Sequence, residues 1–320
     1  MVRGVRVSAR VSRMRAPNPS PMTLDGTNSY LIAAGRGLAV AIDPGPRDAG
    51  HVDALVAAAR ADGAEIGAIL VTHGHPDHAP GAALLHERTG APVYAHPDAG
   101  FPHDVAVADV DAVGFADIAI GVEFAPGHAR DHLAFSLPID GVLFTGDVVI
   151  GRGTVVVAPP GGDMRTYQAT LARLRERHAD ARAILGGHGE RVEDPAAKLD
   201  EYIAHRIARE EDIVAALRSA GTATIPGIVE LVYADTPRAL WPAAARQVLA
   251  YLEALEREGR VRSHVMQRAP TAAESALLHP DLSRIVDAES AAVARAELGF
   301  DEAGAPLVAY ELREHALAQD

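Results

Sequence analysis

The chain has 320 residues, of which 48% are hydrophobic and 23% charged, a composition typical of globular proteins with a sizeable core. Its formal net charge of −13 argues against a broad face for duplex DNA, and no apolar run reaches the ~18 residues of a membrane-spanning helix. The absence of cysteine excludes disulfides and thiolate metal ligands and fits a cytoplasmic protein, so any zinc must be held by histidine and carboxylate.

The predicted elements alternate between strands and helices over the first 195 residues. Residues 1–16 hold five arginines and no acid, which leaves a targeting peptide open. Apolar and polar residues alternate from Val5 to Ser12, however, so we favour a first strand there. This alternation of strands and helices is typical of the α/β class. Further strands are predicted at 28–33, 38–42, 66–71, 92–95, 121–125, 133–137, 142–144 and 183–185, and helices at 52–62, 79–89 and 164–178.

A cluster of ligand-type side chains directly follows the predicted strand over 66–71. The segment Val71-Thr72-His73-Gly74-His75-Pro76-Asp77-His78 places three imidazoles and a carboxylate within six residues. Because ligands of α/β proteins bind beyond the carboxyl ends of strands, the cluster predicts a catalytic metal site rather than a structural cluster. Later strand ends repeat the pattern of a glycine or turn beside a ligand. These further candidates are His128, Asp147 and His188.

Two further polar residues near these strand ends, Asp43 and His132, each have two interpretations, and three others are candidates for substrate contact. Asp43 either caps a turn or orients a metal-binding histidine. His132 is either a hydrogen-bonded strand histidine, which we favour, or a catalytic residue that contacts substrate or a metal ligand. Asn28, Arg152 and Thr154 lie in predicted loops or strand ends from which they could face a substrate.

The C-terminal part changes to helical periodicity. Helices are predicted over 196–218 and from Pro237 onward, with a short basic strand at 260–262, an order that resembles a winged-helix module. We therefore predict a first domain over 1–195, a winged-helix-like domain over 196–265 and an extension of unknown role over 266–320. Helical residues 288–298 and a strand at 306–311 are predicted in the extension. Arginines and glutamates mix on the candidate recognition helix, which favours interdomain packing or homodimerisation over DNA binding.

Histidine with aspartate suits zinc, and less specifically iron or manganese. Seven ligands are too many for one tetrahedral ion but suit two ions about 3.5–4 Å apart that share a carboxylate. A metal-bound water has a pKa near 7, so such a site makes hydroxide without a side-chain nucleophile.

The His-x-His-x-Asp-His pattern at 73–78 resembles the motif of the metallo-β-lactamase superfamily. Within it, the chain is most similar to the β-lactamase-like protein 2 group of metallohydrolases, over roughly residues 5–265. This resemblance implies an αββα sandwich, with two sheets face to face and helices outside, followed by a winged-helix domain. The stretches that carry the similarity, besides 73–78, are 18–31, 126–132, 145–147, 158–164 and 205–210.

The resemblance also implies the roles of the ligands. A hydroxide that bridges the metals would attack the substrate, and Asp77 would orient it or relay its proton. The first zinc would be held by His73, His75 and His128, the second by Asp77, His78 and His188, and Asp147 would bridge the two.

Three reactions remain open for such a centre. The first is phosphodiester cleavage of single-stranded RNA by an endoribonuclease-type activity, which rests on the resemblance and which the acidic net charge opposes. The second is hydrolysis of a small thioester, lactone or β-lactam, which the same ligands would serve. The third is iron-dependent oxidation, which we disfavour because related flavodiiron sites usually carry glutamate in place of His75.

Overall fold

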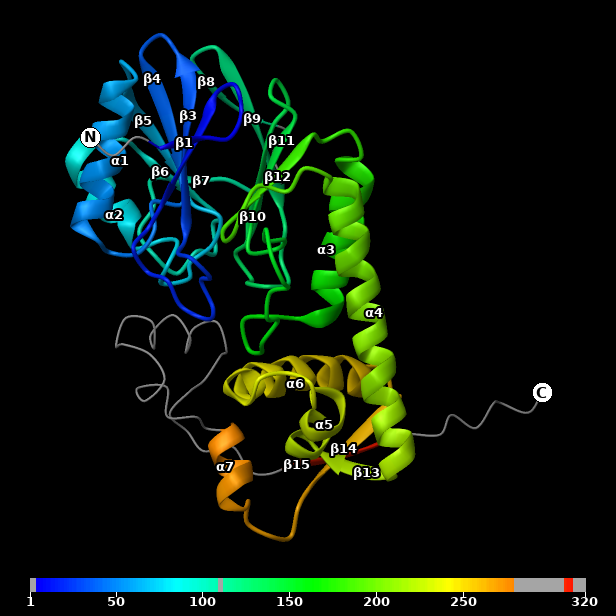
Figure 1. The fold of residues 1–320 in the computed structure, drawn as a ribbon. Helices are drawn as coiled ribbons and strands as arrows, with labels where there is room; N and C mark the ends of the chain where they lie inside the picture. The colour runs from blue at the N-terminus through cyan, green and yellow to red at the C-terminus, as the bar shows by residue number, and fades with distance from the viewer. Residues whose placement is uncertain (1–3, 109–111, 279–307, 313–320) are drawn as a thin grey trace. The chain divides into compact units, whose positions relative to one another are not determined.

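The computed structural model describes residues 4–108 and 112–278 and the backbone of 308–312. The chain forms two compact units, one of Met1–Val155 with Ala169–Tyr202 and the other of Val156–Gln168 with Ile203–Asp320. The first unit holds a seven-stranded and a five-stranded sheet, and the second holds a three-stranded sheet (Figure 1). Among the described helices, none is long and apolar enough to cross a bilayer.

The seven-stranded sheet follows the chain order from β1 to β7. Its first four strands are antiparallel, and from β4 onward each strand runs parallel to the next. Helices α1 (Ala49–Ala61) and α2 (Gly81–Thr89) make two of the parallel connections. The strands are β1 (Val5–Arg6), β2 (Val11–Arg15), β3 (Asn28–Gly35), β4 (Leu38–Ile42), β5 (Glu65–Leu70), β6 (Val93–Ala95) and β7 (Val105–Ala106).

Local signals explain where these helices begin and end. The carboxylate of Asp48 caps α1 by accepting a 2.6 Å hydrogen bond from the amide of His51. Gly90 ends α2 with a φ of +71°, a conformation that glycine adopts without steric cost. The predicted end of this helix is therefore confirmed.

The five-stranded sheet has the order β12-β11-β10-β9-β8. Only β11 and β12 are parallel, and α3 (Met164–Arg177) lies between them in the chain. Leu171 and Leu174 of α3 are fully buried, as their spacing predicts. The strands are β8 (Val113–Phe115), β9 (Ile118–Phe124), β10 (Leu133–Leu137), β11 (Val142–Gly146) and β12 (Ala183–Gly186).

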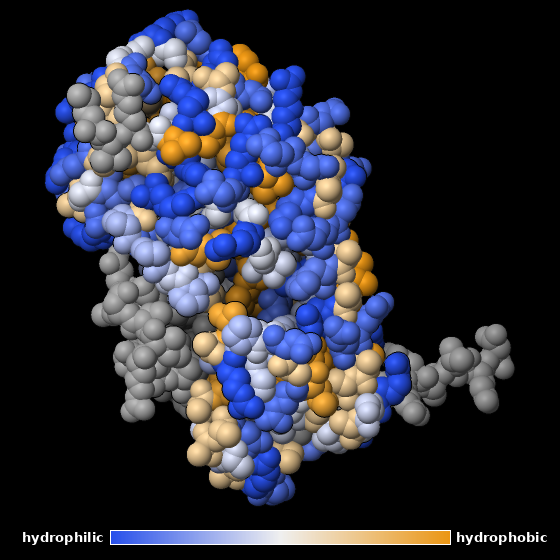
Figure 2. All heavy atoms as spheres, in the orientation of Figure 1, coloured by the Kyte–Doolittle hydropathy of each residue, from blue (hydrophilic) through white to orange (hydrophobic). Residues whose placement is uncertain are grey.

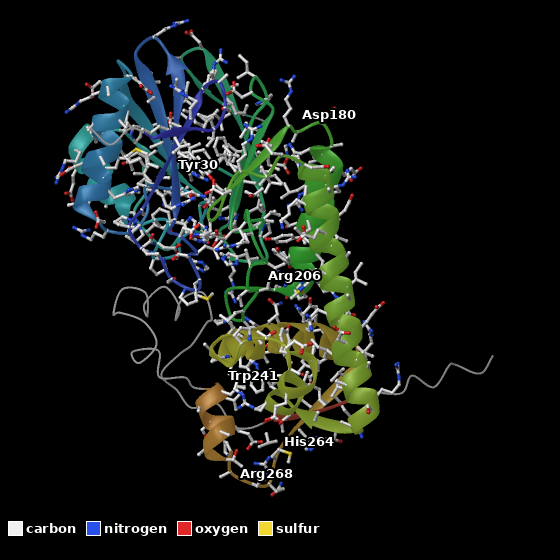
Figure 3. The ribbon with its side chains drawn as sticks, viewed as in Figure 1. Tyr30, Asp180, Arg206, Trp241, His264 and Arg268 are labelled. Atoms are coloured by element: carbon white, nitrogen blue, oxygen red, sulfur yellow. The ribbon has the colours of Figure 1, made fainter. Side chains whose placement is uncertain are left out.

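Alternation along β3 shows how the layers are held together. Tyr30 and Ile32 join the core between the two sheets, where Figure 3 labels Tyr30, whereas Leu31 faces the core under α1 and α2. Phe135 and Phe144 enter the inter-sheet core from the second sheet. Because the first sheet is buried on both faces, its strands read as nearly continuous apolar runs. The predicted αββα sandwich is confirmed.

The second unit is a winged-helix domain, also as predicted. Its sheet has the order β13-β15-β14, so the strand near the C-terminus lies between two strands that precede it by many residues. Its helices begin with the second part of α4 (Pro195–Ala220). The other elements are β13 (Thr222–Thr224), α5 (Ile225–Val232), the 3-10 helix η1 (Arg238–Leu240), α6 (Trp241–Arg257), β14 (Val261–Val265), α7 (Ala272–Leu278) and β15 (Val308–Leu312).

The predicted domain boundaries differ from the division into units. The break predicted after residue 195 coincides with the start of α4, whereas the units meet inside this helix, after Tyr202. Residues 156–168 belong to the second unit, although they precede the predicted break. The predicted strand over 306–311 corresponds to β15, so the extension contributes to the winged-helix sheet. The predicted helix over 288–298 lies outside the described residues.

A buried arginine explains why residues 156–168 join the second unit. Arg206, labelled in Figure 3, is only 1% exposed, and its guanidinium lies 5.1 Å from the ring centre of Tyr167. The side-chain oxygen of Gln247 accepts hydrogen bonds from Arg206 at 3.3 Å and from the amide of Val157 at 3.0 Å. The segment is thus held by residues of both α4 and α6.

Candidate metal centre

The predicted ligands converge in the first unit, at the ends of strands from both sheets. They form three overlapping groups, and within each group the ligand atoms all lie within 4.8 Å of one another. All seven predicted ligands take part. The first group is His73, His75 and His128, the second is Asp77, His78 and His188, and a third, of His73, His78 and Asp147, shares residues with both.

Asp43 orients two parts of the 73–78 segment. It follows β4 with a φ of +47°, an uncommon backbone conformation that aspartate tolerates better than most residues. Its carboxylate accepts hydrogen bonds from the amide and hydroxyl of Thr72 at 2.7 and 2.8 Å, and from Nδ1 of His78 at 2.9 Å. Of the two interpretations of Asp43, the structure favours the second, because its carboxylate orients His78; that His78 binds a metal stays a prediction. Nε2 of His78 is left to face the centre.

The same network fixes the tautomer of His73. Because the Thr72 hydroxyl donates its proton to Asp43, it can only accept from Nδ1 of His73, 3.0 Å away. Nε2 of His73 therefore carries the lone pair, and it has no hydrogen-bond partner among the described residues. Burial and then the neighbouring imidazoles of His78 and His75 hold the pKa of His73 well below its ordinary value. A neutral imidazole with a free lone pair is the form that binds a metal.

The second ligand group and Asp147 together bring two carboxylates against two imidazoles. Asp77 Oδ2 lies 3.2 Å from Nε2 of His78 and 3.3 Å from Nε2 of His188, and Asp147 Oδ2 lies 3.2 Å from the same nitrogen of His188. Burial opposes the protonation of both imidazoles, but the carboxylates outweigh it. They raise the pKa of His78 well above its ordinary value and the pKa of His188 to about 10. A bound cation would replace these protons.

Spacing and burial both fit metal ions. Tetrahedral ligands about 2.0 Å from zinc lie about 3.3 Å from one another, close to the separations in the second group and to the 3.2 Å between Nε2 of His128 and Nδ1 of His75. Buried polar atoms without a partner are rare, because each costs free energy. Here two such atoms, His73 Nε2 and Asp77 Oδ1, lie at the centre without a hydrogen-bond partner among the described residues.

The centre opens to solvent on the side of the first group. His75 is half-buried and Gly74 is exposed, whereas the other ligands are buried. A substrate would therefore approach beside His75.

Asp147 is held in place through its backbone amide as well as through the contacts of its carboxylate. It follows β11, and its amide donates a 3.1 Å hydrogen bond to Nε2 of His132. The ring of His132 is fully buried and stacks on that of His73, with the centroids 4.6 Å apart. Of the interpretations of His132, this position favours contact with metal ligands. A direct catalytic role for His132 stays a prediction.

Sequence reasoning missed what holds the His188 loop. Asn28, considered as a substrate contact, is 1% exposed, and its side-chain amide donates to the carbonyl oxygens of Gly186 and Gly189 at 3.0 and 2.9 Å. The Tyr30 hydroxyl donates to Gly186 at 2.6 Å. These bonds join β3 to a loop almost 160 positions away, so no local pattern could have predicted them. Of the other two substrate candidates, Arg152 is exposed and Thr154 half-buried.

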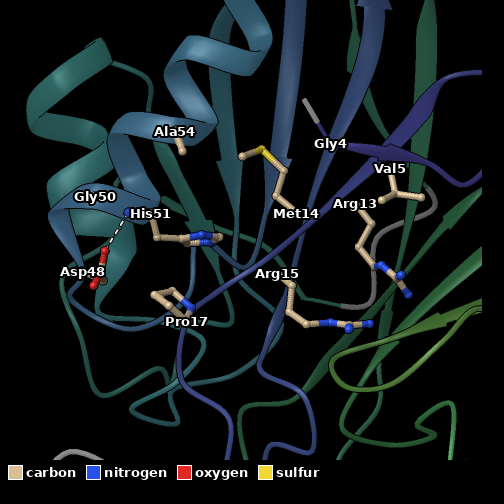
Figure 4. A pocket seen from close by; sticks show the side chains of 10 residues that line it. All are labelled: Gly4, Val5, Arg13, Met14, Arg15, Pro17, Asp48, Gly50, His51 and Ala54. Carbon is tan, nitrogen blue, oxygen red and sulfur yellow. Dashed lines mark hydrogen bonds between the residues drawn. The ribbon is translucent and has the colours of Figure 1, made fainter. Parts of the chain in front are cut away.

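A separate cavity of about 380 Å³ lies between β2 and α1 (Figure 4). Arg13 and Arg15 line it, but their guanidinium groups point away from His51 and pair with Glu190 at 2.8 and 2.7 Å. None of the predicted ligands lines this cavity.

Comparisons with known proteins match both units. A family model described as the Metallo-beta-lactamase superfamily matches residues 22–188, and one described as the Beta-lactamase associated winged helix domain matches residues 224–268. The structure is similar to that of a metallo-beta-lactamase family protein from Thermus thermophilus, with a TM-score of 0.65 and 24% identity over 79% of this chain and 95% of that chain.

Curated relatives are similar over most of the chain. The Lactamase-like protein adaB of Aspergillus niger is 36% identical over 72% of this chain and 75% of its own length. The Beta-lactamase-like protein 2 homolog of Drosophila melanogaster is 32% identical over 80% of this chain and 91% of its own length. The Atrochrysone carboxyl ACP thioesterase of Aspergillus chevalieri is 32% identical over 72% and 76%.

Proposed function

Because this chain belongs to the metallo-beta-lactamase superfamily and is a hydrolase of that superfamily, we propose that it works with two zinc ions at the centre described above. The observation that carries the proposal is the position of Asp147. Its carboxylate lies 3.5 Å from Nε2 of His78 and 3.2 Å from Nε2 of His188, and it shares a ligand group with His73. A carboxylate in this position can serve two ions at once.

The residues divide the work around the ions. When bound, zinc supplies a hydroxide nucleophile at neutral pH. Asp43 holds His78 in the tautomer that presents Nε2, and Thr72 does the same for His73. We assign proton handling to Asp77 Oδ1, because this oxygen of Asp77 has no hydrogen-bond partner among the described residues, whereas Oδ2 accepts from Thr27. His132 positions the backbone of Asp147.

Single-stranded RNA is the first proposed substrate class. Support comes from the resemblance to the β-lactamase-like protein 2 group, whose name the Drosophila melanogaster relative carries, and from the appended winged-helix domain. Because the net charge of −13 does not attract a polyanion, the phosphodiester would be held mainly by the ions themselves. Arg152, exposed in the segment after Asp147, is one candidate for a further phosphate contact.

A thioester is the second proposed substrate class. The observation in its favour is the 32% identity with the Atrochrysone carboxyl ACP thioesterase of Aspergillus chevalieri, which extends over 72% of this chain. The same nucleophile would attack a thioester carbonyl, so the ligands do not separate the two classes.

A substrate panel tests the proposal. The zinc-loaded protein is incubated with labelled single-stranded RNA, an acyl thioester, a lactone and nitrocefin, after its metal content has been measured. Asp147→Ala protein, purified in parallel, controls for contaminating ribonuclease. We expect about two ions per chain and RNA cleavage that the control lacks. Hydrolysis of the thioester alone would favour the second class, and fewer than two ions per chain in the active protein would contradict the two-zinc mechanism.

A further inference from the structure

Thr27 lies immediately before β3 and is completely buried beside the second ligand group. Its hydroxyl donates a 2.8 Å hydrogen bond to Oδ2 of Asp77, the oxygen that lies against the imidazoles of His78 and His188. Its backbone also pairs with His188 in an isolated antiparallel bridge. One residue outside the predicted ligand set therefore contacts two predicted ligands, which reach it from different sheets.

The direction of the Thr27 hydroxyl is set by Asn18. The side-chain oxygen of Asn18 accepts from the amide of Thr27 at 2.9 Å, so its side-chain nitrogen must face the Thr27 hydroxyl, 3.0 Å away. That nitrogen can only donate. Because the hydroxyl has one proton and already accepts from Asn18, its proton is committed to Asp77.

The hydroxyl constrains Asp77 without neutralising it. A carboxylate oxygen has two lone pairs, and the Thr27 proton occupies one of those on Oδ2. The other is left for the side on which His78 and His188 lie, at 3.2 and 3.3 Å. An arginine or lysine in place of Thr27 would also orient the carboxylate, but its positive charge would oppose a cation bound there.

We propose that Asn18 and Thr27 are positioning residues for the second metal ion: they fix Oδ2 of Asp77 in the second ligand group through one hydroxyl proton. The inference rests on the proposed two-zinc function and assigns to these residues an effect on that ion. Among the hydrogen bonds of the described residues, none joins Thr27 or Asn18 to the first group of His73, His75 and His128. The affinity of that group should therefore not depend on them.

Stepwise metal binding to the full-length protein tests the inference. Metal-free wild type, Thr27→Val and Thr27→Ser are titrated with zinc in competition with a chromophoric chelator, so that the two ions are measured separately. Valine keeps the shape of the threonine side chain but removes the hydroxyl proton, whereas serine keeps the hydroxyl. We expect T27V to weaken the second ion about 10- to 100-fold, the usual effect of losing an outer-shell partner, and to leave the first unchanged. T27S should stay close to wild type.

The matched control is Thr89→Val. The Thr89 hydroxyl donates only within α2, to the carbonyl of Leu85 at 2.7 Å, so its removal should leave both affinities unchanged. Circular dichroism of the metal-free variants checks that they fold. If T27V does not fold, Asn18→Ala carries the test, because it removes the donor that directs the hydroxyl while keeping Thr27.

Each outcome has one meaning. A second-ion affinity in folded T27V, or in N18A if T27V does not fold, that equals the wild-type value would overturn the inference. Equal weakening of both ions would overturn it as well, since the effect would then not be specific to Asp77. Fewer than two ions in the wild type would instead contradict the proposed two-zinc function.

Discussion

The carboxylate of Asp147 lies near imidazoles of more than one ligand group, so its removal should be the most damaging change at the centre. We expect Asp147→Ala to lower kcat more than about 100-fold, since even outer-shell partners of a metal cost about 10- to 100-fold. Initial rates at saturating zinc measure the effect. Asp98→Ala, at a side chain that is 84% exposed, is the control and should retain the wild-type rate. Turnover by Asp147→Ala at a similar rate would remove Asp147 from the mechanism.

Gly187 leaves room for the ligands beside it. A Cβ at this position would lie 2.6 Å from Cε1 of His78 and closer still to Oδ1 of Asp147. Gly187→Ala should therefore displace Asp147 and lower activity at least about 10-fold, with the fold retained. Gly100→Ala, where a Cβ would meet nothing within 4 Å, is the matched control. Activity and circular dichroism measured together check this, and an active Gly187→Ala protein would contradict the close approach.

Metal loading should release protons. In the metal-free protein the carboxylates raise the pKa of His188 to about 10, so its imidazole carries a proton at pH 7.5, and they raise the pKa of His78 well above its ordinary value. An ion must displace the protons held there, and affinity should rise with pH between 6 and 9. Calorimetry in buffers of different ionisation enthalpy should give a release of at least about one proton per chain, from His188, with further protons from His78 and from the metal-bound water. Identical binding enthalpies in all the buffers would contradict the expectation.

At the scale of elements, Asp140 links the turn between β10 and β11 to the segment before β2. It accepts hydrogen bonds from the hydroxyl of Ser8 at 2.6 Å, and from the amide and guanidinium of Arg10 at 2.8 and 3.1 Å. Burial alone would raise the pKa of Asp140, but these donors outweigh it and hold the pKa below its ordinary value. Asp140→Asn should lower the free energy of unfolding by about 1–3 kcal/mol at pH 7.

The pH dependence follows from the sign of that shift. A carboxylate whose pKa is lowered by folding contributes its full stability above its unfolded pKa of about 3.9, and the contribution is lost as pH falls through the folded pKa. The difference between wild type and Asp140→Asn should therefore persist at pH 5 and shrink below pH 4. Urea denaturation at each pH measures it, with the exposed Asp98→Asn as the control. A constant difference down to pH 2.5 would exclude this cause.

How far the sequence could predict each element depends on how local its signals are. β10 was predicted with the bounds it has, because apolar runs flanked by turn residues are readable in place. The strands β7 and β8 have two and three residues, and the pattern of 97–118 gave no sign of them. The same holds for the site. Six consecutive residues predicted the ligands at 73–78, whereas Thr27 contacts Asp77 across 50 positions and is itself held by Asn18, without any periodicity.

At the scale of the whole molecule, the predicted metal ligands and the winged-helix domain lie in different units. Figure 2 shows hydrophilic residues over most of the visible face of the first unit. Because the predicted ligands all lie in the first unit, removal of metal should loosen that unit selectively. We expect hydrogen exchange to accelerate in peptides that cover 71–79 and 186–190 when a chelator is added, and to stay unchanged in peptides from 225–257. Equal acceleration in both sets would show that the units do not respond separately.

The ligand segments follow β5 in the first sheet and β9, β11 and β12 in the second, so neither sheet alone can complete the centre. A metal ion that absorbs visible light can then report when the two sheets come together during folding. If cobalt(II) is added while the chain refolds, its visible absorption should develop only once the two sheets have docked, later than the far-ultraviolet signal of the strands. The centre thus offers an optical readout of the last step of assembly, and a substitution in the inter-sheet core would delay the colour without touching a ligand.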